Sequence, residues 1–177
     1  YNFPFLTKYL PGLAVTVINL AVRQQGLIVA PGNPLGIAGV ADLADGKVRY
    51  LNRQRGAGTR ILFDYHLAQA GIDPSRVSGY GREEHTHMAV AVNVCTGAAD
   101  CGLGVYAAAK ALGLDFVPLA RERYDLVVPT AYLGDPKIEA VLETVRGGDF
   151  AARVEALGGY ETAWTGRVME PGMGLPD

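Results

Sequence analysis

Short β-branched apolar runs alternate with stretches of helical periodicity along this chain. Residues 15–20 and 48–51 have the composition of strands. Residues 59–70 and 138–145 place apolar side chains at helical spacing. Such alternation is typical of an α/β fold, and it predicts a parallel sheet.

The composition indicates a folded, turn-rich domain. Apolar residues make up 49% of the 177 residues, which is enough for a sizeable core. The 23 glycines and 10 prolines follow no period, so a collagen-like chain is excluded and turns are favoured. A net charge of −2 argues against nucleic-acid contact over the whole surface. No apolar run is long enough to predict a membrane span.

The two cysteines, Cys95 and Cys101, form neither a CxxC pair nor a zinc-ligand pattern. Small secreted domains usually carry more cysteines, so the sequence predicts a reduced, cytoplasmic protein. Cys95 follows an apolar helical run, and we expect a buried, unreactive thiol there.

The most informative stretch is residues 52–60, Asn-Arg-Gln-Arg-Gly-Ala-Gly-Thr-Arg. It joins a strand to a helix at the strand end where open α/β sheets bind ligands. The glycines let backbone approach a ligand, Thr59 can cap the helix or donate its hydroxyl, and the helix dipole favours an anion. Arg53, Arg55 and Arg60 add three cations. We predict an anion site here; the alternative is a capped turn with solvated arginines. The glycine spacing is not that of a Walker P-loop.

A second polar segment, residues 82–87, precedes the next helix. Thr86 is a helix-start hydroxyl, and His85 stands beside it as a candidate ligand contact. His85 and His87 also suggest a metal. However, side chains two residues apart diverge around a helix, and no third ligand lies nearby. The sequence therefore favours a capping or solvated role and predicts no metal site.

Residues 102–107 match the dinucleotide pattern G-x-G-x-x-G/A only in isolation. The short strand before them favours a glycine-rich strand end packed against a helix. Tyr106 is either a hydroxyl donor facing a ligand or a core tyrosine. The chain has no Gly-x-Ser-x-Gly elbow, and its serines are Ser75 and Ser78 alone. No catalytic residue and no covalently bound cofactor is predicted, and whether the chain is part of an enzyme stays open.

The helix start Gly-Ala-Gly-Thr, followed by two further contact points at helix starts, resembles the type II periplasmic-binding-protein fold. Within that fold the chain is similar to the substrate-binding-like domain fused to molybdopterin molybdotransferases and to helix-turn-helix regulators. The segments that carry the likeness are residues 26–34, 52–60, 83–90, 99–104 and 114–119.

The resemblance implies an α/β fold of two lobes that close on a ligand by hinge motion. Lobe one would comprise residues 1–31 and 125–166, and lobe two residues 32–124, with 167–177 as a frayed tail. The leading βαβ segment of lobe one is not among these residues, so we expect that lobe to be incomplete at its N-terminal side.

The resemblance also implies a small oxyanion, molybdate or tungstate, held at helix starts. By matching position, Ala57, Gly58, Thr59, Thr86 and Tyr106 would contribute from lobe two. The implied function is non-catalytic ligand binding or sensing; the alternative is an accessory domain in molybdopterin-cofactor biosynthesis. The expected partners are a small anionic ligand and a fused transferase or DNA-binding domain. We expect no membrane contact and no direct nucleic-acid contact by this chain.

Overall fold

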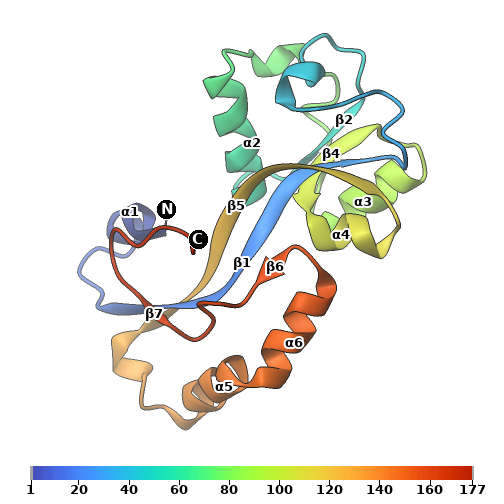
Figure 1. The fold of residues 1–177 in the computed structure, drawn as a ribbon. Helices are drawn as coiled ribbons and strands as arrows, with labels where there is room; N and C mark the ends of the chain where they lie inside the picture. The colour runs from blue at the N-terminus through green and yellow to red at the C-terminus, as the bar shows by residue number, and fades with distance from the viewer. Residues whose placement is uncertain (1, 177) are drawn as a thin grey trace. The chain divides into compact units, whose positions relative to one another are not determined.

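A computed structural model describes residues 2–176 (Figure 1). Its elements, in chain order, are α1 (Asn2–Tyr9), β1 (Val15–Val29), η1 (Val40–Leu43), β2 (Tyr50–Arg53), α2 (Gly58–Gln69), η2 (Pro74–Arg76), β3 (Glu83–Glu84), α3 (His87–Cys95), β4 (Cys101–Val105), α4 (Tyr106–Ala111), β5 (Asp115–Pro129), η3 (Thr130–Tyr132), α5 (Pro136–Arg146), α6 (Gly148–Leu157), β6 (Tyr160–Glu161) and β7 (Val168–Met169). Strands and helices alternate, which confirms the α/β class.

The sheet is mixed, and the prediction of a parallel sheet is therefore wrong. Its strand order is β3-β2-β4-β1-β5, with β6 and β7 also paired to β1. β2 is parallel to β3 and β4, whereas β1 is antiparallel to β4, β6 and β7. Apolar periodicity identifies a strand but carries no information on the direction of its neighbour, so the sequence could not show this.

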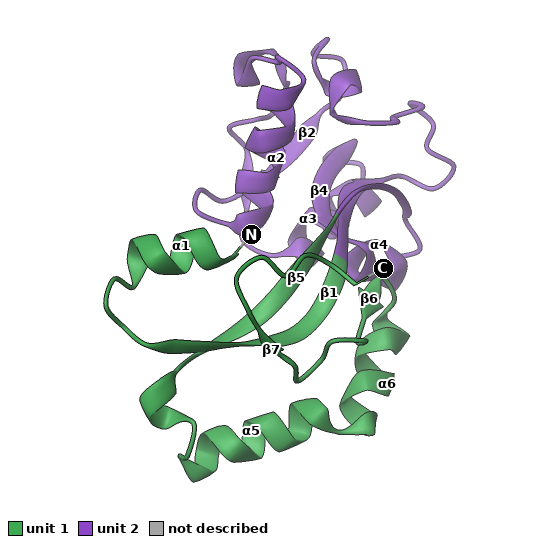
Figure 2. Ribbon diagram, turned by 60° about the vertical axis from the view of Figure 1, so that its left-hand side comes forward, with its two compact units in different colours: residues 1–23, 121–177 green, residues 24–120 purple. Residues whose placement is uncertain are grey.

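The chain forms two compact units (Figure 2). Unit 1 comprises residues 1–23 and 121–177, and unit 2 comprises residues 24–120. Both divisions fall inside long strands, β1 and β5, each of which contributes residues to both units. The two lobe boundaries were expected a few residues later in the chain, after residue 31 and after residue 124.

The core of unit 2 lies on both faces of its strands. Alternate residues of a strand point to opposite faces, so Leu27 and Val29 join one cluster while Ile28 joins the other. Phe63 and Leu67 bring α2 onto the first face, and residues of α3 and α4 cover the second (Figure 1). This layering leaves the carboxyl ends of β2 and β4 at one edge of the sheet, where α2 and α4 begin.

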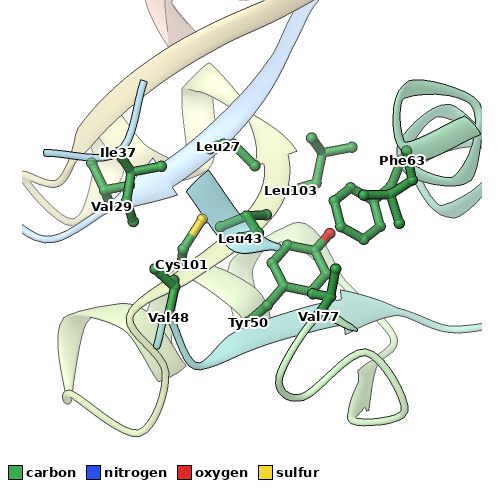
Figure 3. Packing of buried hydrophobic residues seen from close by; sticks show 11 residues of the cluster. Leu27, Val29, Ile37, Leu43, Val48, Tyr50, Phe63, Val77, Cys101 and Leu103 are labelled. Carbon is green, nitrogen blue, oxygen red and sulfur yellow. The ribbon is translucent and has the colours of Figure 1, made fainter. Parts of the chain in front are cut away.

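Tyr50 and Phe63 stack at the centre of the first cluster, with ring centroids 4.2 Å apart (Figure 3). Cys101 lies in the same cluster, and burial raises the pKa of its thiol well above the usual range. Cys95, in contrast, is exposed. The expectation of a buried Cys95 is therefore wrong, because this residue is the last of α3 and lies on the helix face away from the core.

Unit 1 has its own small core around Ile18, Val128 and Leu142. Residues 168–169, which the sequence assigned to a tail, form β7 and pair with β1. A buried ion pair also lies in this unit, with Arg123 Nη2 3.2 Å from Asp125 Oδ2. Within the described residues, no helix is both long and apolar enough to cross a membrane.

Candidate functional site

The start of α2 is open and carries no side-chain cap. Gly56 turns the chain with a positive φ of 86°, a conformation that favours glycine. Ala57 follows as the N-cap residue and makes no side-chain hydrogen bond to the first turn. A Cβ built on Gly58 would meet nothing within 4 Å. The first backbone N–H groups of a helix have no partner within the helix, so this start offers donors to an anion.

Thr59 is buried, and its hydroxyl points into the protein. Only 3% of the residue is exposed, and its Oγ1 donates to Gln25 Oε1 at 3.1 Å. Gln25 belongs to β1, is fully buried, and pairs across the sheet with Val105, the last residue of β4. Sequence reasoning missed Gln25. The sequence shows two consecutive glutamines, Gln24 and Gln25, within β1. The sequence alone does not show which of the two side chains points toward α2.

Arg53 connects the end of β2 to the segment that leads into α3. The residue is only 8% exposed. Its Nε donates to Gln54 Oε1 and to the Glu84 carbonyl, both at 3.2 Å, and its Nη2 donates to the His85 carbonyl at 2.9 Å. A guanidinium that was expected to face a ligand thus holds the backbone before a second helix start.

His87, the first residue of α3, completes this contact. Its Nδ1 lies 3.0 Å from Arg53 Nη1. Because a guanidinium can only donate, we assign Nδ1 as the acceptor, which places the ring proton of neutral His87 on Nε2. A Cβ on Gly104 would lie 3.6 Å from the same Nδ1, so His87 sits against the end of β4.

Thr86 and His85 lie beside this contact and are exposed. Thr86 is the N-cap of α3, and its Oγ1 accepts from the Ala89 N–H at 3.0 Å. The hydroxyl hydrogen is left to donate outward. Among the described residues, no group of three His, Cys, Asp or Glu side chains is placed to hold a metal.

Tyr106 begins α4 and is half-buried. Its ring packs edge-on against Phe116, with centroids 5.3 Å apart. This contact belongs to the core on the α4 side of the sheet, where Phe116 also packs. The structure places Tyr106 directly after Val105, the cross-strand partner of Gln25, at the same sheet edge.

The remaining two arginines differ sharply from each other. The Arg55 side chain is 90% exposed, with Nε 4.0 Å from Glu83 Oε1. Arg60 is buried, pairs with Asp64 at 3.2 Å and Glu83 at 3.1 Å, and stacks on the Tyr80 ring. Arg55 is therefore available to a ligand in solution, whereas Arg60 stabilises unit 2.

Fold and site together define a protein of the periplasmic-binding-protein class. The chain belongs to the PBP-like family, because the family model described as "PBP superfamily domain" matches residues 1–146.

The individual relatives are consistent with this assignment. The chain is 39% identical over 169 residues to the protein YvgK of Bacillus subtilis (strain 168), covering 96% of this chain and 54% of YvgK. It therefore spans about half the length of that relative. Among solved structures, it resembles the ancestral amino acid-binding protein AncCDT-1, with a TM-score of 0.58 and 16% identity over 87% of this chain and 64% of that one. It also resembles a substrate-binding domain assigned to a molybdenum ABC transporter of Clostridium difficile, with a TM-score of 0.59 and 16% identity over 90% of this chain and 72% of that one.

Proposed function

We propose that this chain is a non-catalytic binding domain that takes a small oxyanion at the start of α2, with molybdate or tungstate as the ligand. One observation carries the proposal. The helix start is uncapped, and a Cβ added at Gly58 would meet no atom within 4 Å. An uncapped start directs its backbone N–H donors and the positive end of the helix dipole away from the helix.

The charges around this helix start favour an anion over a cation. Arg55 is exposed beside it, and the guanidinium of Arg53 lies at the end of the preceding strand. The carboxylate of Glu83, which lies 4.0 Å from Arg55 Nε, is also paired with Arg60. The exposed hydroxyl of Thr86 supplies one further donor from the neighbouring α3.

Membership of the PBP-like family supports small-ligand binding. The choice of molybdate or tungstate rests on the sequence resemblance and on the fold shared with the domain assigned to a molybdenum transporter. We further propose that a transferase or DNA-binding domain, where one is fused to this domain, responds to ligand binding.

Calorimetry with molybdate, tungstate, sulfate and phosphate tests the proposal directly. We expect saturable heat from molybdate or tungstate. The absence of heat from all four anions would contradict the oxyanion function.

Gly58→Ala locates the site. Gly58 has no positive φ and no neighbour within 4 Å, so the added methyl should leave stability unchanged or raise it by up to about 1 kcal/mol. The same methyl would project beside the first turn of α2 and crowd an anion bound there, and we expect at least about tenfold weaker binding, which corresponds to about 1.4 kcal/mol. Gly81→Ala is the matched control, because its Cβ also meets nothing and it lies outside the site. Equal affinity in both variants would place the anion elsewhere.

A further inference from the structure

Little apolar packing holds helix α1 on unit 1. None of its residues is buried, and a helix of eight residues is not stable in water by itself. A cavity of about 480 Å³ lies against α1, β1 and β7, and apolar side chains such as Leu6, Val17 and Met169 line it. Contacts of another kind therefore keep α1 folded on this unit.

Polar contacts join the start of α1 to residues 170–176. Asn2 Nδ2 donates to Asp125 Oδ2 at 2.7 Å. The same oxygen lies 3.2 Å from Arg123 Nη2, and both side chains of this ion pair are almost completely buried. Arg123 Nη1 in turn donates to the Met173 carbonyl at 2.7 Å, and its guanidinium lies over the Phe3 ring. α1 and residues 170–176 thus share one buried ion pair.

A tight turn shapes the segment that contacts Arg123. The Met173 N–H donates to the Glu170 carbonyl at 3.2 Å, and Pro171 and Gly172 occupy the two central positions. Gly172 has a φ of 87°, and a type II turn requires such a positive φ at its third residue. The turn fixes the direction of the Met173 carbonyl, which in turn orients the Arg123 guanidinium.

We propose that α1 is a lid over this apolar cavity and that residues 170–176 are its latch. When the latch leaves Arg123, the buried guanidinium loses a hydrogen bond and no longer holds Asp125 in position for Asn2. The lid and the latch therefore open together, and α1 melts once it leaves unit 1. The strands stay folded, because their core cluster is formed with residues of β1, β5 and α5. This device lies in unit 1 and does not depend on the proposed function.

Amide hydrogen exchange measures this opening in the full chain. The Leu10 N–H, which donates to the Leu6 carbonyl at 2.8 Å, reports on the lid, and the Met173 N–H reports on the latch. The Asn19 N–H of β1, which donates to the Arg167 carbonyl, is the reference. In the wild type we expect both reporters to be at least about a hundredfold less protected than Asn19, because local opening costs less than global unfolding. Equal protection of all three amides would overturn the inference.

Gly172→Ala weakens the latch alone. Alanine is strained at this positive φ, so we expect the Met173 and Leu10 amides to exchange about fivefold to thirtyfold faster than in the wild type. Gly71→Ala is the matched control, because Gly71 also has a positive φ, 66°, and an added Cβ there meets nothing within 4 Å, but it lies in unit 2. The control should leave exchange at Leu10 within about twofold of the wild type. Faster exchange at Met173 with unchanged exchange at Leu10 would show that the two segments open separately, and would overturn the inference.

Asn2→Ala loosens the lid and stays informative if Gly172→Ala does not fold. It removes the hydrogen bond to Asp125, which keeps Arg123 as its partner. Because coupling between two segments is reciprocal, we expect the distant Met173 amide to exchange about fivefold faster or more. Unchanged exchange at Met173 in this variant would contradict a joint opening.

Discussion

Gly102 and Gly58 lack a side chain for two different reasons. A Cβ on Gly102 would lie 2.4 Å from Val90 Cγ1 and 2.8 Å from the Leu51 carbonyl oxygen, so α3 and β2 close over this position. Gly58 has open space around it. Close packing thus accounts for the first glycine of the G-x-G-x-x-A stretch, in agreement with the interpretation of residues 102–107 as a packed strand end.

Gly102→Ala should destabilise the protein. The added methyl would displace a backbone oxygen as well as a side chain, and overpacking of this kind costs about 1–3 kcal/mol. Urea unfolding measures the loss, with Gly81→Ala as the neutral reference. Equal stability of the two variants would show that α3 can move away at little cost.

The Arg49–Asp100 pair predicts a pH dependence of stability. The hydrogen bond from Arg49 lowers the pKa of Asp100 below its ordinary value. A carboxyl whose pKa is lower in the folded state stabilises the protein above its unfolded pKa, and this contribution disappears as the pH falls through the folded value. Because the Arg49 side chain is half exposed, we expect about 0.5–1 kcal/mol.

Asp100→Asn checks this prediction. The difference in unfolding free energy between the wild type and the variant should be present at pH 7, begin to shrink near about pH 4, where an unperturbed Asp titrates, and be lost as the pH falls through the lowered pKa of Asp100. A difference that is constant across this range would show that the carboxylate charge contributes nothing.

At the scale of elements, the sequence predicted where α2 begins to within one residue, but it did not predict the length of strand β1. The predicted helix over residues 59–70 is α2, with its start one residue earlier, because the Gly-Ala-Gly-Thr turn marks it locally. The strand expected at residues 15–20 is much longer in the structure, where β1 continues through the polar residues 23–25 to Val29. In the structure Arg23 pairs with Glu122 and Gln25 with Thr59, both distant in sequence. The local sequence pattern cannot reveal contacts between residues this far apart in the chain.

The difference between local and long-range contacts also explains which parts of the candidate site were predicted. Ala57, Gly58 and Thr86 stand at helix starts, as expected. The contact from Arg53 to His87 and the bond from Gln25 to Thr59 join residues 34 positions apart in both cases. Helix α1 (Asn2–Tyr9) was not predicted, and none of its residues is fully buried in the structure.

Thr86→Ala should weaken α3. The hydroxyl caps the Ala89 N–H, and losing an N-cap of this kind costs about 1 kcal/mol. Urea unfolding measures the effect. Thr96→Ala at the other end of α3 is the control, because Thr96 is exposed and donates to carbonyls within the same helix. A larger loss at Thr96 than at Thr86 would contradict the assigned cap.

At the scale of the whole chain, distant segments of unit 1 meet at Asp125. Asn2 and Asn19 donate to its two carboxylate oxygens at 2.7 Å and 2.9 Å. Arg123 pairs with it and also donates to the Met173 carbonyl at 2.7 Å. The two ends of the described chain are therefore tied to the same strand, β5.

Asp125→Ala should be among the most destabilising single substitutions in unit 1. It would leave the buried Arg123 without its carboxylate, and breaking a buried pair costs about 3–5 kcal/mol. Asp149→Ala, at an exposed position of α6, should change stability by no more than about 0.5 kcal/mol. Thermal unfolding of both variants checks this, and similar melting temperatures would contradict the structural role of Asp125.

The central claim, that this family member binds a small oxyanion at the start of α2, is tested most directly by following backbone amide resonances during titration with molybdate. We predict saturable shifts that are largest at Gly58, Thr59 and Arg60, the first turn of α2. Saturable shifts confined to residues outside α2 and the segments around Arg53 and Thr86, or no shifts at all, would contradict it.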